Sequence, residues 1–393
     1  VIERVAYTWF NRFCALRFMD VHGYTGMGVV SPAAGYTQPE ILLEAKQGHI
    51  DDDLAPLAKR QAILDLLAGR APSRDPQGEA YRLLLVAACN AWHDAMPFLF
   101  QRIDDYSELL MPDDLLSAGS ILQGVRDAMT PERCQDVEII GWLYQFYISE
   151  KKDQVIGAKQ KIEAEDIPAA TQLFTPHWIV RFLVENSLGR LWLLNHPESR
   201  LAERMDYYIG DRSTVNGEPS GTDHGSPVPR SDEPGSPFTD YLRVSSPEEL
   251  RVGDPAVGSG HMLTYAFDLL YLIYEEQGYN PREIPRLILE HNLYGMEIDE
   301  RAAALAAFAL AMKARAKDSR FLRRGVPPHI VVLRPIAFRD DELQPLLGGM
   351  VDALVQQAKA RKEARPALRD ALLHDLHLWA EADNFGSLLR PQL

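Results

Sequence analysis

Cysteine is scarce in this sequence, and its pattern excludes two classes of protein. The 393 residues contain three cysteines, Cys14, Cys89 and Cys134, which lie far apart. Disulfide scaffolds need an even and denser set, and a zinc site needs Cys or His ligands at close spacing. We therefore expect no disulfide and no metal, and each cysteine is predicted to be a small core residue in a cytoplasmic protein.

Long apolar runs are missing as well. No run approaches the ~18 residues of a membrane-spanning helix, so we expect no membrane partner. The chain begins at Val1 and passes directly into an amphipathic stretch, without the charged segment or cleavage site of a signal peptide. Because an initiator methionine is also missing, we expect the protein to have residues upstream.

Positive charge is in the minority, since 41 Lys and Arg face 56 Asp and Glu and give a formal net charge of −15. A protein that grips the DNA backbone usually presents a basic face. The richest basic segments, 313–324 and 359–365, are short. A local basic face is still compatible with this charge, but the balance predicts that the main DNA-reading part lies elsewhere.

The first 165 residues predict a helical domain. Apolar residues recur at three- and four-residue spacing in 2–20, 54–68, 79–92 and 136–148. Proline and glycine lie between these runs. The aromatic residues Trp142, Tyr144, Phe146 and Tyr147 have core-like spacing. This domain carries no predicted chemistry.

Residues 166–340 predict an α/β domain. Strand patterns alternate with helix patterns, which indicates right-handed crossovers and a parallel sheet. The predicted strands are 250–254, 292–299 and 329–333, and the predicted helices are 262–274, 283–290 and 300–317. Within residues 209–239, 15 of 31 are Gly, Pro or Ser, which predicts a flexible surface insertion. Residues 341–393 predict a further helical segment.

A glycine-rich string follows the first of these strands. It allows a sharp turn and close approach to a ligand, its helix start offers free N–H groups, and its acid can bind an ammonium group, as a methionine moiety requires. The string is Asp254, Pro255, Ala256, Val257, Gly258, Ser259 and Gly260.

The second strand ends in an acid, Glu297, which is followed by Ile298. An acid here binds the ribose hydroxyls of an adenosine ligand. Dinucleotide folds place it about 20 residues after the glycines, but 43 residues separate Asp254 from Glu297 and the third glycine is missing. NAD and FAD are therefore disfavoured, and the missing lysine excludes an NTPase phosphate loop. Asp299, the rival carboxylate, is expected to cap the next helix.

A third string, Phe174-Thr175-Pro176, precedes a long amphipathic run at 178–194. Thr175 is predicted as the N-cap and Pro176 as the first helical residue. The order of this string, the glycine string and Tyr-Gly-x-Glu-Ile-Asp at 294–299 resembles the gamma-order adenine-N6 DNA methyltransferases, including modification subunits of type I restriction systems. Segments 5–19, 142–152 and 260–263 are similar, more narrowly, to PglX-type methyltransferases of BREX phage-defence systems.

This resemblance covers nearly the whole chain except 209–239. It implies a helical domain, then a Rossmann-like core that binds S-adenosylmethionine, with DNA-reading parts downstream. Residues 254–260 would surround the methionine part of the cofactor, Thr175 and Pro176 would cover it, and Glu297 with Ile298 would hold the adenosine part. Two positions depart from the pattern. Val257 stands where many relatives have Cys, and we expect the position to tolerate this change because it serves through its size and backbone. Arg334 follows the third strand, where many relatives place an acid.

The catalytic string of the family, (Asn/Asp/Ser)-Pro-Pro-(Tyr/Phe), is missing. In the family its polar group and a proline carbonyl accept hydrogen bonds from the target N6, and its aromatic ring stacks on the flipped adenine. The nearest string, Val326-Pro327-Pro328-His329, has neither the polar residue nor the aromatic ring. No residue is therefore predicted as catalytic, and we expect a cofactor-binding portion of a longer methyltransferase.

The resemblance implies that the full-length enzyme methylates adenine N6 in duplex DNA and so marks self DNA in phage defence. Its expected partners are double-stranded DNA, mainly through downstream parts, other defence proteins and a phage-encoded inhibitor that mimics DNA. Two alternatives stay open. The core could methylate a protein amide, or the chain could be a non-catalytic, cofactor-binding or interaction scaffold, as its acidic charge and missing catalytic string would suit.

Overall fold

The structure is a computed structural model of the chain. It describes residues 2–103, 110–158, 162, 166–210, 243–333, 347–353, 355 and 365–380. All but two residues of the predicted insertion, as well as Arg334 and most of the basic segment 359–365, lie outside the described residues. The chain forms two compact units, one of residues 1–147 with 173–331 and one of residues 148–172 with 332–393. The domain boundaries that we expect at 165 and 340 stay predictions.

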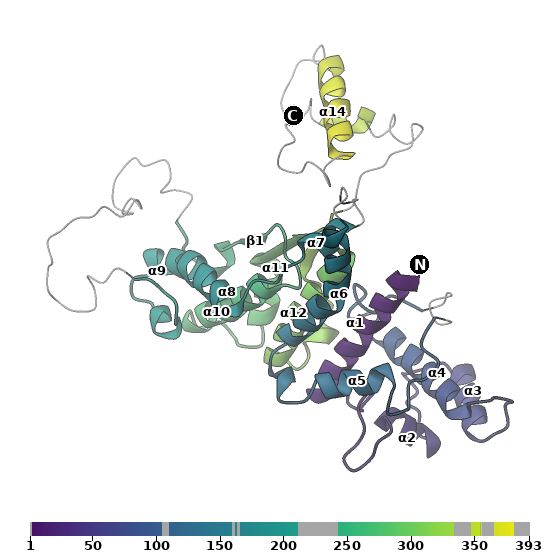
Figure 1. Ribbon diagram of the computed structural model, residues 1–393. Helices are drawn as coiled ribbons and strands as arrows, with labels where there is room; N and C mark the ends of the chain where they lie inside the picture. The colour runs from purple at the N-terminus through teal and green to yellow at the C-terminus, as the bar shows by residue number, and fades with distance from the viewer. Residues whose placement is uncertain are drawn as a thin grey trace, which may run out of the picture. The chain divides into compact units, whose positions relative to one another are not determined.

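Helices make up the N-terminal part of the first unit, as the apolar spacing predicts (Figure 1). Two begin at residues that suit the position, since Asp75 precedes Pro76 and accepts from the Gly78 N–H, and the Ser120 hydroxyl accepts from the Gln123 N–H. Their bounds are α1 Ile2–Val21, α2 Glu40–Lys46, α3 Leu57–Leu67, α4 Pro76–Ala91, α5 Ile121–Ala128 and α6 Glu138–Gly157.

Two of these helices, α2 and α5, were not among the predicted runs. They have seven and eight residues, too few for a helical period to stand out in sequence. The core of this part is large and aromatic, and its fully buried side chains include Phe13, Leu16, Met19, Tyr81 and Phe100. The three cysteines are buried and unpaired, as expected.

The α/β part of the first unit contains the three predicted strands, β1 (Val252–Asp254), β2 (Leu293–Glu297) and β3 (His329–Val332). Their order in the sheet is β1-β2-β3. Strands β1 and β2 are parallel, and their register places Val252 opposite Leu293 and Asp254 opposite Gly295. The predicted parallel pairing is confirmed, and the carboxyl ends of β1 and β2 meet at one edge of the sheet.

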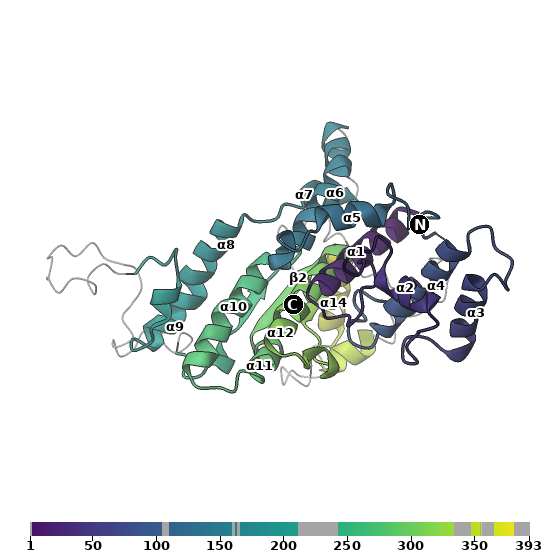
Figure 2. The same cartoon turned by 90° about the horizontal axis from the view of Figure 1, so that it is seen from below.

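Helices α10 (His261–Glu276), α11 (Ile284–His291) and α12 (Glu300–Lys317) connect and cover the strands. They lie side by side in Figure 2, and α10 packs against both of the others. Their core is apolar and continuous, because α10 buries Phe267 and Leu270 while the alanine-rich α12 buries Ala306 and Leu310. The result is a mixed fold with a small parallel sheet, compatible with the predicted α/β class.

The helix after residue 176 corrects one prediction. Thr175 is not the N-cap: Pro176 occupies that position with φ −55° and ψ 140°, which are typical of extended backbone, and α8 begins at His177. The Pro176 carbonyl accepts the first helical bonds, from the N–H groups of Ile179 and Val180. The predicted long run is otherwise present as α8 (His177–Val184), a π-helical turn at Glu185–Gly189 and α9 (Arg190–Asn195).

The second unit is mostly helical where it is described. It contains the C-terminal part of α6, the short α7 (Ile167–Thr171), a helix at 347–353 and α14 (Arg365–Ala380). Leu347, Val351 and Leu372 form a small buried cluster. This agrees with the helical segment predicted after residue 340.

A buried hydrogen bond joins α6 to the start of α12. The Tyr144 hydroxyl donates to Asp299 Oδ2 over 2.5 Å, and Asp299 Oδ1 caps α12 by accepting from the Arg301 N–H. The predicted capping role of Asp299 is thus confirmed. The predicted core role of the α6 aromatic residues is wrong in part, because Tyr144 is fully buried but Phe146 is 72% exposed. Residues two apart on a helix do not share a face.

Replacement of Tyr144 by Phe should therefore destabilise the unit. The change leaves Asp299 Oδ2 buried without its hydroxyl donor, and loss of one partner of a buried hydrogen bond costs about 1–3 kcal/mol. Denaturant unfolding measures this loss. Tyr147→Phe on the same helix is the control, because Tyr147 is 42% exposed; equal stability of both variants and the parent would contradict the argument.

An acidic group near the start of α6 responds to pH. Lys313 Nζ lies 3.0 Å from Asp136 Oδ2 and 2.7 Å from Asp268 Oδ2. Glu138 lies in the same acidic neighbourhood, where burial and then the charge of Asp136 raise its pKa to about 7 against the partial relief from Lys313. The folded state therefore holds a proton at Glu138 that the unfolded chain releases near its ordinary pKa.

The contribution of Glu138 to the free energy of unfolding should therefore fall as pH rises from about 4.5 to 7 and then level off. Glu138→Gln should remove this decline and be more stable than the parent at pH 8, on the order of 1 kcal/mol once solvent screening is allowed for. Urea unfolding at pH 4.5, 6 and 8 measures both curves. Parallel curves for the two proteins would count against the raised pKa.

Candidate functional site

The turn after β1 lies against the end of β2. The Val257 N–H donates to the Met296 carbonyl over 2.9 Å, so the chain continues beside β2 beyond the paired strand. It then turns into α10, and the Gly260 N–H closes the turn by donating to the Val257 carbonyl. Residues 254–260 therefore form a strand–turn–helix connection, the setting in which the glycine string was predicted to bind a ligand.

Both glycines of this turn need to be glycine. Gly258 has φ +55° and Gly260 has φ +94°, values that strain other residues. A Cβ on Gly258 would lie 3.2 Å from Cε1 of Phe174, and a Cβ on Gly260 would lie 3.1 Å from Cα of Ala306. The first glycine admits the Phe174 ring, and the second admits the backbone of α12.

Glu297 binds the turn directly. Its Oε2 accepts the Gly258 N–H over 2.7 Å, and its Oε1 accepts the N–H groups of Ile298 and Asp299 over 2.9 and 3.0 Å. The side chain is half-buried. A carboxylate has about four acceptor sites, so three N–H donors leave it one more hydrogen bond, such as one from a hydroxyl group.

Asp254 stands at the end of β1 with one oxygen engaged. Its Oδ1 accepts the Ala256 N–H over 3.1 Å, which shapes the start of the turn. Burial raises the pKa of this carboxyl, and the Ala256 N–H partly offsets the rise. Within the described part of the chain, no hydrogen bond is recorded for Oδ2. That oxygen is the one that an ammonium group could approach.

The segment 174–176 comes together with this turn. Phe174 is buried against Gly258, and its N–H donates to Gln145 Oε1 of α6 over 3.3 Å. Thr175 is half-buried and Pro176 is exposed. The structure thus brings together three strings that are far apart in sequence. The main chain of Asp299 is bonded to Glu297, whereas its side chain caps α12.

Sequence reasoning missed His261, Gln145 and Gly141. His261 is 5% exposed and its ring lies 5.2 Å from that of Phe174 and 5.6 Å from that of Trp142, centroid to centroid. A Cβ on Gly141 would lie 3.0 Å from His261 Nε2. The signal available was the position of His261 directly after the glycine string; nothing in the sequence singled out the two residues of α6.

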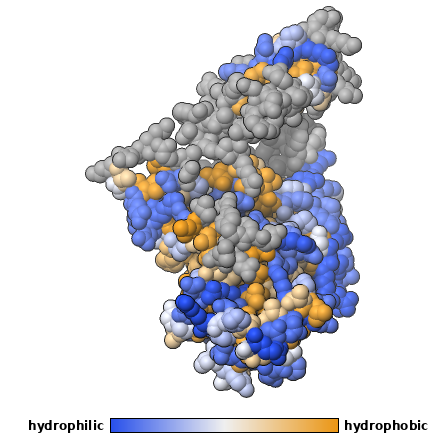
Figure 3. Space-filling model, turned by 90° about the vertical axis from the view of Figure 1, so that its right-hand side faces the viewer, coloured by the Kyte–Doolittle hydropathy of each residue, from blue (hydrophilic) through white to orange (hydrophobic). Residues whose placement is uncertain are grey.

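Apolar side chains lie exposed next to the strand ends. Met296 and Ile298 are 43% and 41% exposed, and Val331 of β3 is 55% exposed. On the face drawn in Figure 3, apolar surface appears as separate patches between polar regions. Ile298, which directly follows Glu297, is therefore accessible to an apolar ligand group such as an adenine ring.

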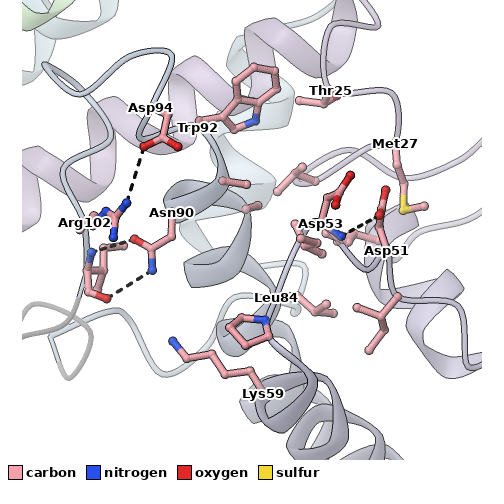
Figure 4. Close-up of a pocket in the computed structure, with 18 of the residues that line it drawn as sticks. Thr25, Met27, Asp51, Asp53, Lys59, Leu84, Asn90, Trp92, Asp94 and Arg102 are labelled. Carbon is pink, nitrogen blue, oxygen red and sulfur yellow. Dashed lines mark hydrogen bonds and ion pairs between the residues drawn. The ribbon is translucent and has the colours of Figure 1, made fainter. Parts of the chain in front are cut away.

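A further cavity lies away from this turn, mostly among the N-terminal helices. Its volume is about 910 Å³, and its lining includes Asp51, Lys59, Leu84, Trp92 and Arg102 (Figure 4). Charged side chains of both signs and apolar side chains line it, and no residue predicted from the sequence for the site lies in it. Residues 104–109, which continue the chain from this lining, are outside the described residues.

No group of three or more His, Cys, Asp or Glu side chains among the described residues is arranged to hold a metal ion. Among the described helices, none combines the length and apolar character that crossing a membrane requires.

Comparison with known proteins indicates the class of protein to which the chain is similar. The chain is similar over most or all of its length to proteins named as adenine-specific methyltransferases. No family model matches the chain.

Two relatives make the similarity specific. The adenine-specific methyltransferase BrxX of Escherichia coli O9:H4 (strain HS) is 43% identical over 404 aligned positions, which cover 100% of this chain and 31% of the relative. The adenine-specific methyltransferase PglX of Lacticaseibacillus casei (strain Zhang) is 39% identical over 338 positions, which cover 84% of this chain and 27% of the relative. The chain is a homologue of the BrxX and PglX methyltransferases, as the resemblance predicts, and the matched regions span less than a third of the length of either relative.

Replacement of Gly258 by Ala should destabilise the first unit by about 1–2 kcal/mol, because a Cβ strains the left-handed backbone and presses on Phe174. Gly253→Ala is the matched control: Gly253 lies in β1 without positive φ, and its Cβ would meet nothing within 4 Å. Denaturant unfolding of both variants measures the difference. A Gly258→Ala protein as stable as the control would refute the steric argument.

Proposed function

We propose that this chain supplies the S-adenosylmethionine-binding part of an adenine-N6 DNA methyltransferase. The observation that carries the proposal is the hydrogen bond from the Gly258 N–H to Glu297, which joins the glycine turn after β1 to the acid after β2. Adenosine-containing cofactors bind outside the carboxyl ends of parallel strands, where such a turn and such an acid converge. Similarity to two named adenine-specific methyltransferases supports the same reading.

The methionine end of the cofactor fits the glycine turn. Asp254 Oδ2 is available for the ammonium group, and the start of α10 after Gly260 offers main-chain N–H groups to the carboxylate. Pro255, Ala256 and Val257 supply main chain and small side chains, and Ser259 lies buried behind the turn. Small residues here leave the backbone accessible to the ligand.

The adenosine end fits the end of β2. Glu297 retains an acceptor site for a ribose hydroxyl, and the exposed Ile298 offers an apolar contact to the adenine ring. Thr175 and Pro176 would cover the cofactor from the other side, since Phe174 next to them packs on Gly258. Bound there, the cofactor supplies an activated methyl group, while this chain's residues bind and orient it and limit access of water.

The acceptor of the methyl group would be the N6 atom of adenine in duplex DNA. This sequence has no (Asn/Asp/Ser)-Pro-Pro-(Tyr/Phe) string, so the groups that accept the flipped base belong to other parts of the enzyme. The net charge of −15 fits that division, because a DNA-gripping surface is usually basic. In this proposal the enzyme marks self DNA in a BREX-type phage-defence system.

No described contact favours methylation of a protein amide, and both relatives are named for adenine. The scaffold alternative shares the cofactor site and differs only in chemistry. Full-length protein separates the two, because an enzyme incorporates labelled methyl groups into DNA and a scaffold does not.

Calorimetric titration of S-adenosylmethionine into the chain tests the site. Glu297→Gln and Asp254→Asn should each weaken binding by about tenfold or more, because each removes a charged acceptor aimed at the ligand. Glu290→Gln is the control, since Glu290 pairs with Arg286 on α11 and should leave affinity within about twofold.

Binding that is equally tight in the parent, Glu297→Gln and Asp254→Asn would show that the ligand site is elsewhere. A folded parent chain that does not bind S-adenosylmethionine would contradict the proposal that this chain holds the cofactor.

A further inference from the structure

His261 lies between the two segments that the proposed site brings together, yet the proposal gives it no role. It is the first residue of α10, directly after Gly260, and is 5% exposed. Its ring packs against those of Phe174 and of Trp142 on α6. A buried imidazole in such a place is either passive filling or a fixed anchor, and its hydrogen bonds distinguish these roles.

The hydrogen bonding of the ring favours an anchor. His261 is hydrogen-bonded to the Thr175 main chain, and its Nε2 has no partner in the described structure. Nδ1 is the ring nitrogen left for this bond, and we assign it as the donor to the Thr175 carbonyl. Burial lowers the pKa of the ring and nearby His177 adds to this, against the opposing effects of the Thr175 bond and Asp136. The neutral ring thus carries its proton on Nδ1.

Close approach of α6 encloses the other edge of the ring. A Cβ on Gly141 would contact Ser259 Oγ and would lie 3.0 Å from His261 Nε2, so the missing side chain leaves room for both groups. Neither Ser259 Oγ nor His261 Nε2 has a hydrogen-bond partner in the described residues. Of the two ring nitrogens, the bonded one is therefore the one that faces Thr175.

We propose that His261 is a positioning residue for the cofactor site. Its ring fixes the main chain at Thr175 and the ring of Phe174 against the glycine turn, and so holds the segment 174–176 where it can cover a ligand. The inference rests on the proposed cofactor role of that turn. It assigns the ring no contact with the reacting methyl group.

Two variants separate the hydrogen bond from the packing. His261→Asn keeps a donor near the position of Nδ1, whereas His261→Phe keeps a ring and loses the donor. Hydrogen exchange of the amides of residues 173–175, 177 and 178 is measured without ligand, and the affinity for S-adenosylmethionine is measured on the same proteins. Thermal unfolding checks that each variant is folded.

His261→Phe should exchange these amides about tenfold faster than the parent and bind the cofactor about tenfold more weakly, as loss of one anchoring hydrogen bond would give. His261→Asn should stay within about threefold of the parent in both measurements. Unchanged exchange in a folded His261→Phe protein would overturn the positioning role. Faster exchange in a protein whose parent does not bind S-adenosylmethionine would uphold the anchor and reject the proposed cofactor function.

If His261→Phe does not fold, a measurement on the parent protein tests the same inference. Nitrogen-15 NMR of the histidine rings reports which nitrogen of His261 carries the proton. The inference requires the proton on Nδ1 and a bare Nε2. A proton on Nε2 would remove the donor to Thr175 and overturn the inference without any variant.

Discussion

The carboxylate of Glu297 is the interaction on which the site depends. Parallel pairing of β1 and β2 brings the ends of the two strands together, but it does not determine the path of the chain beyond them. Glu297 does so by accepting the Gly258 N–H from the turn and two N–H groups from its own strand end. Because one acid binds both ends, the glycine turn, the start of α10 and the end of β2 form a single rigid rim.

The helical part supports this rim from behind. Helix α6 contributes the Tyr144 hydroxyl to the cap of α12 and the Gln145 side chain to the Phe174 N–H. On the same helix, Gly141 allows close approach of the glycine turn. The N-terminal helices therefore act as a structural support for the proposed cofactor site, although they carry none of its predicted residues. Their own cavity, lined by Asp51 and Trp92 among others, is separate.

The sequence predicted those features that depend on local pattern. The strands, helices α10 to α12 and the Asp299 cap follow from apolar period, chain punctuation and capping chemistry, all of which act over a few residues. Features that depend on packing escaped prediction. Thr175 has the side chain of an N-cap, but α8 begins after Pro176. His261 reads as an ordinary helix residue until Phe174 and Trp142 pack against it.

The central claim is that S-adenosylmethionine binds at the ends of β1 and β2. A crystal structure of the chain grown with S-adenosylmethionine tests it most directly. The account predicts the amino-acid end of the ligand at Asp254 and the turn, with a ribose hydroxyl on Glu297 and segment 174–176 over it. Ligand found instead in the cavity beside Trp92, or a well-ordered turn without ligand at saturating cofactor, would contradict it.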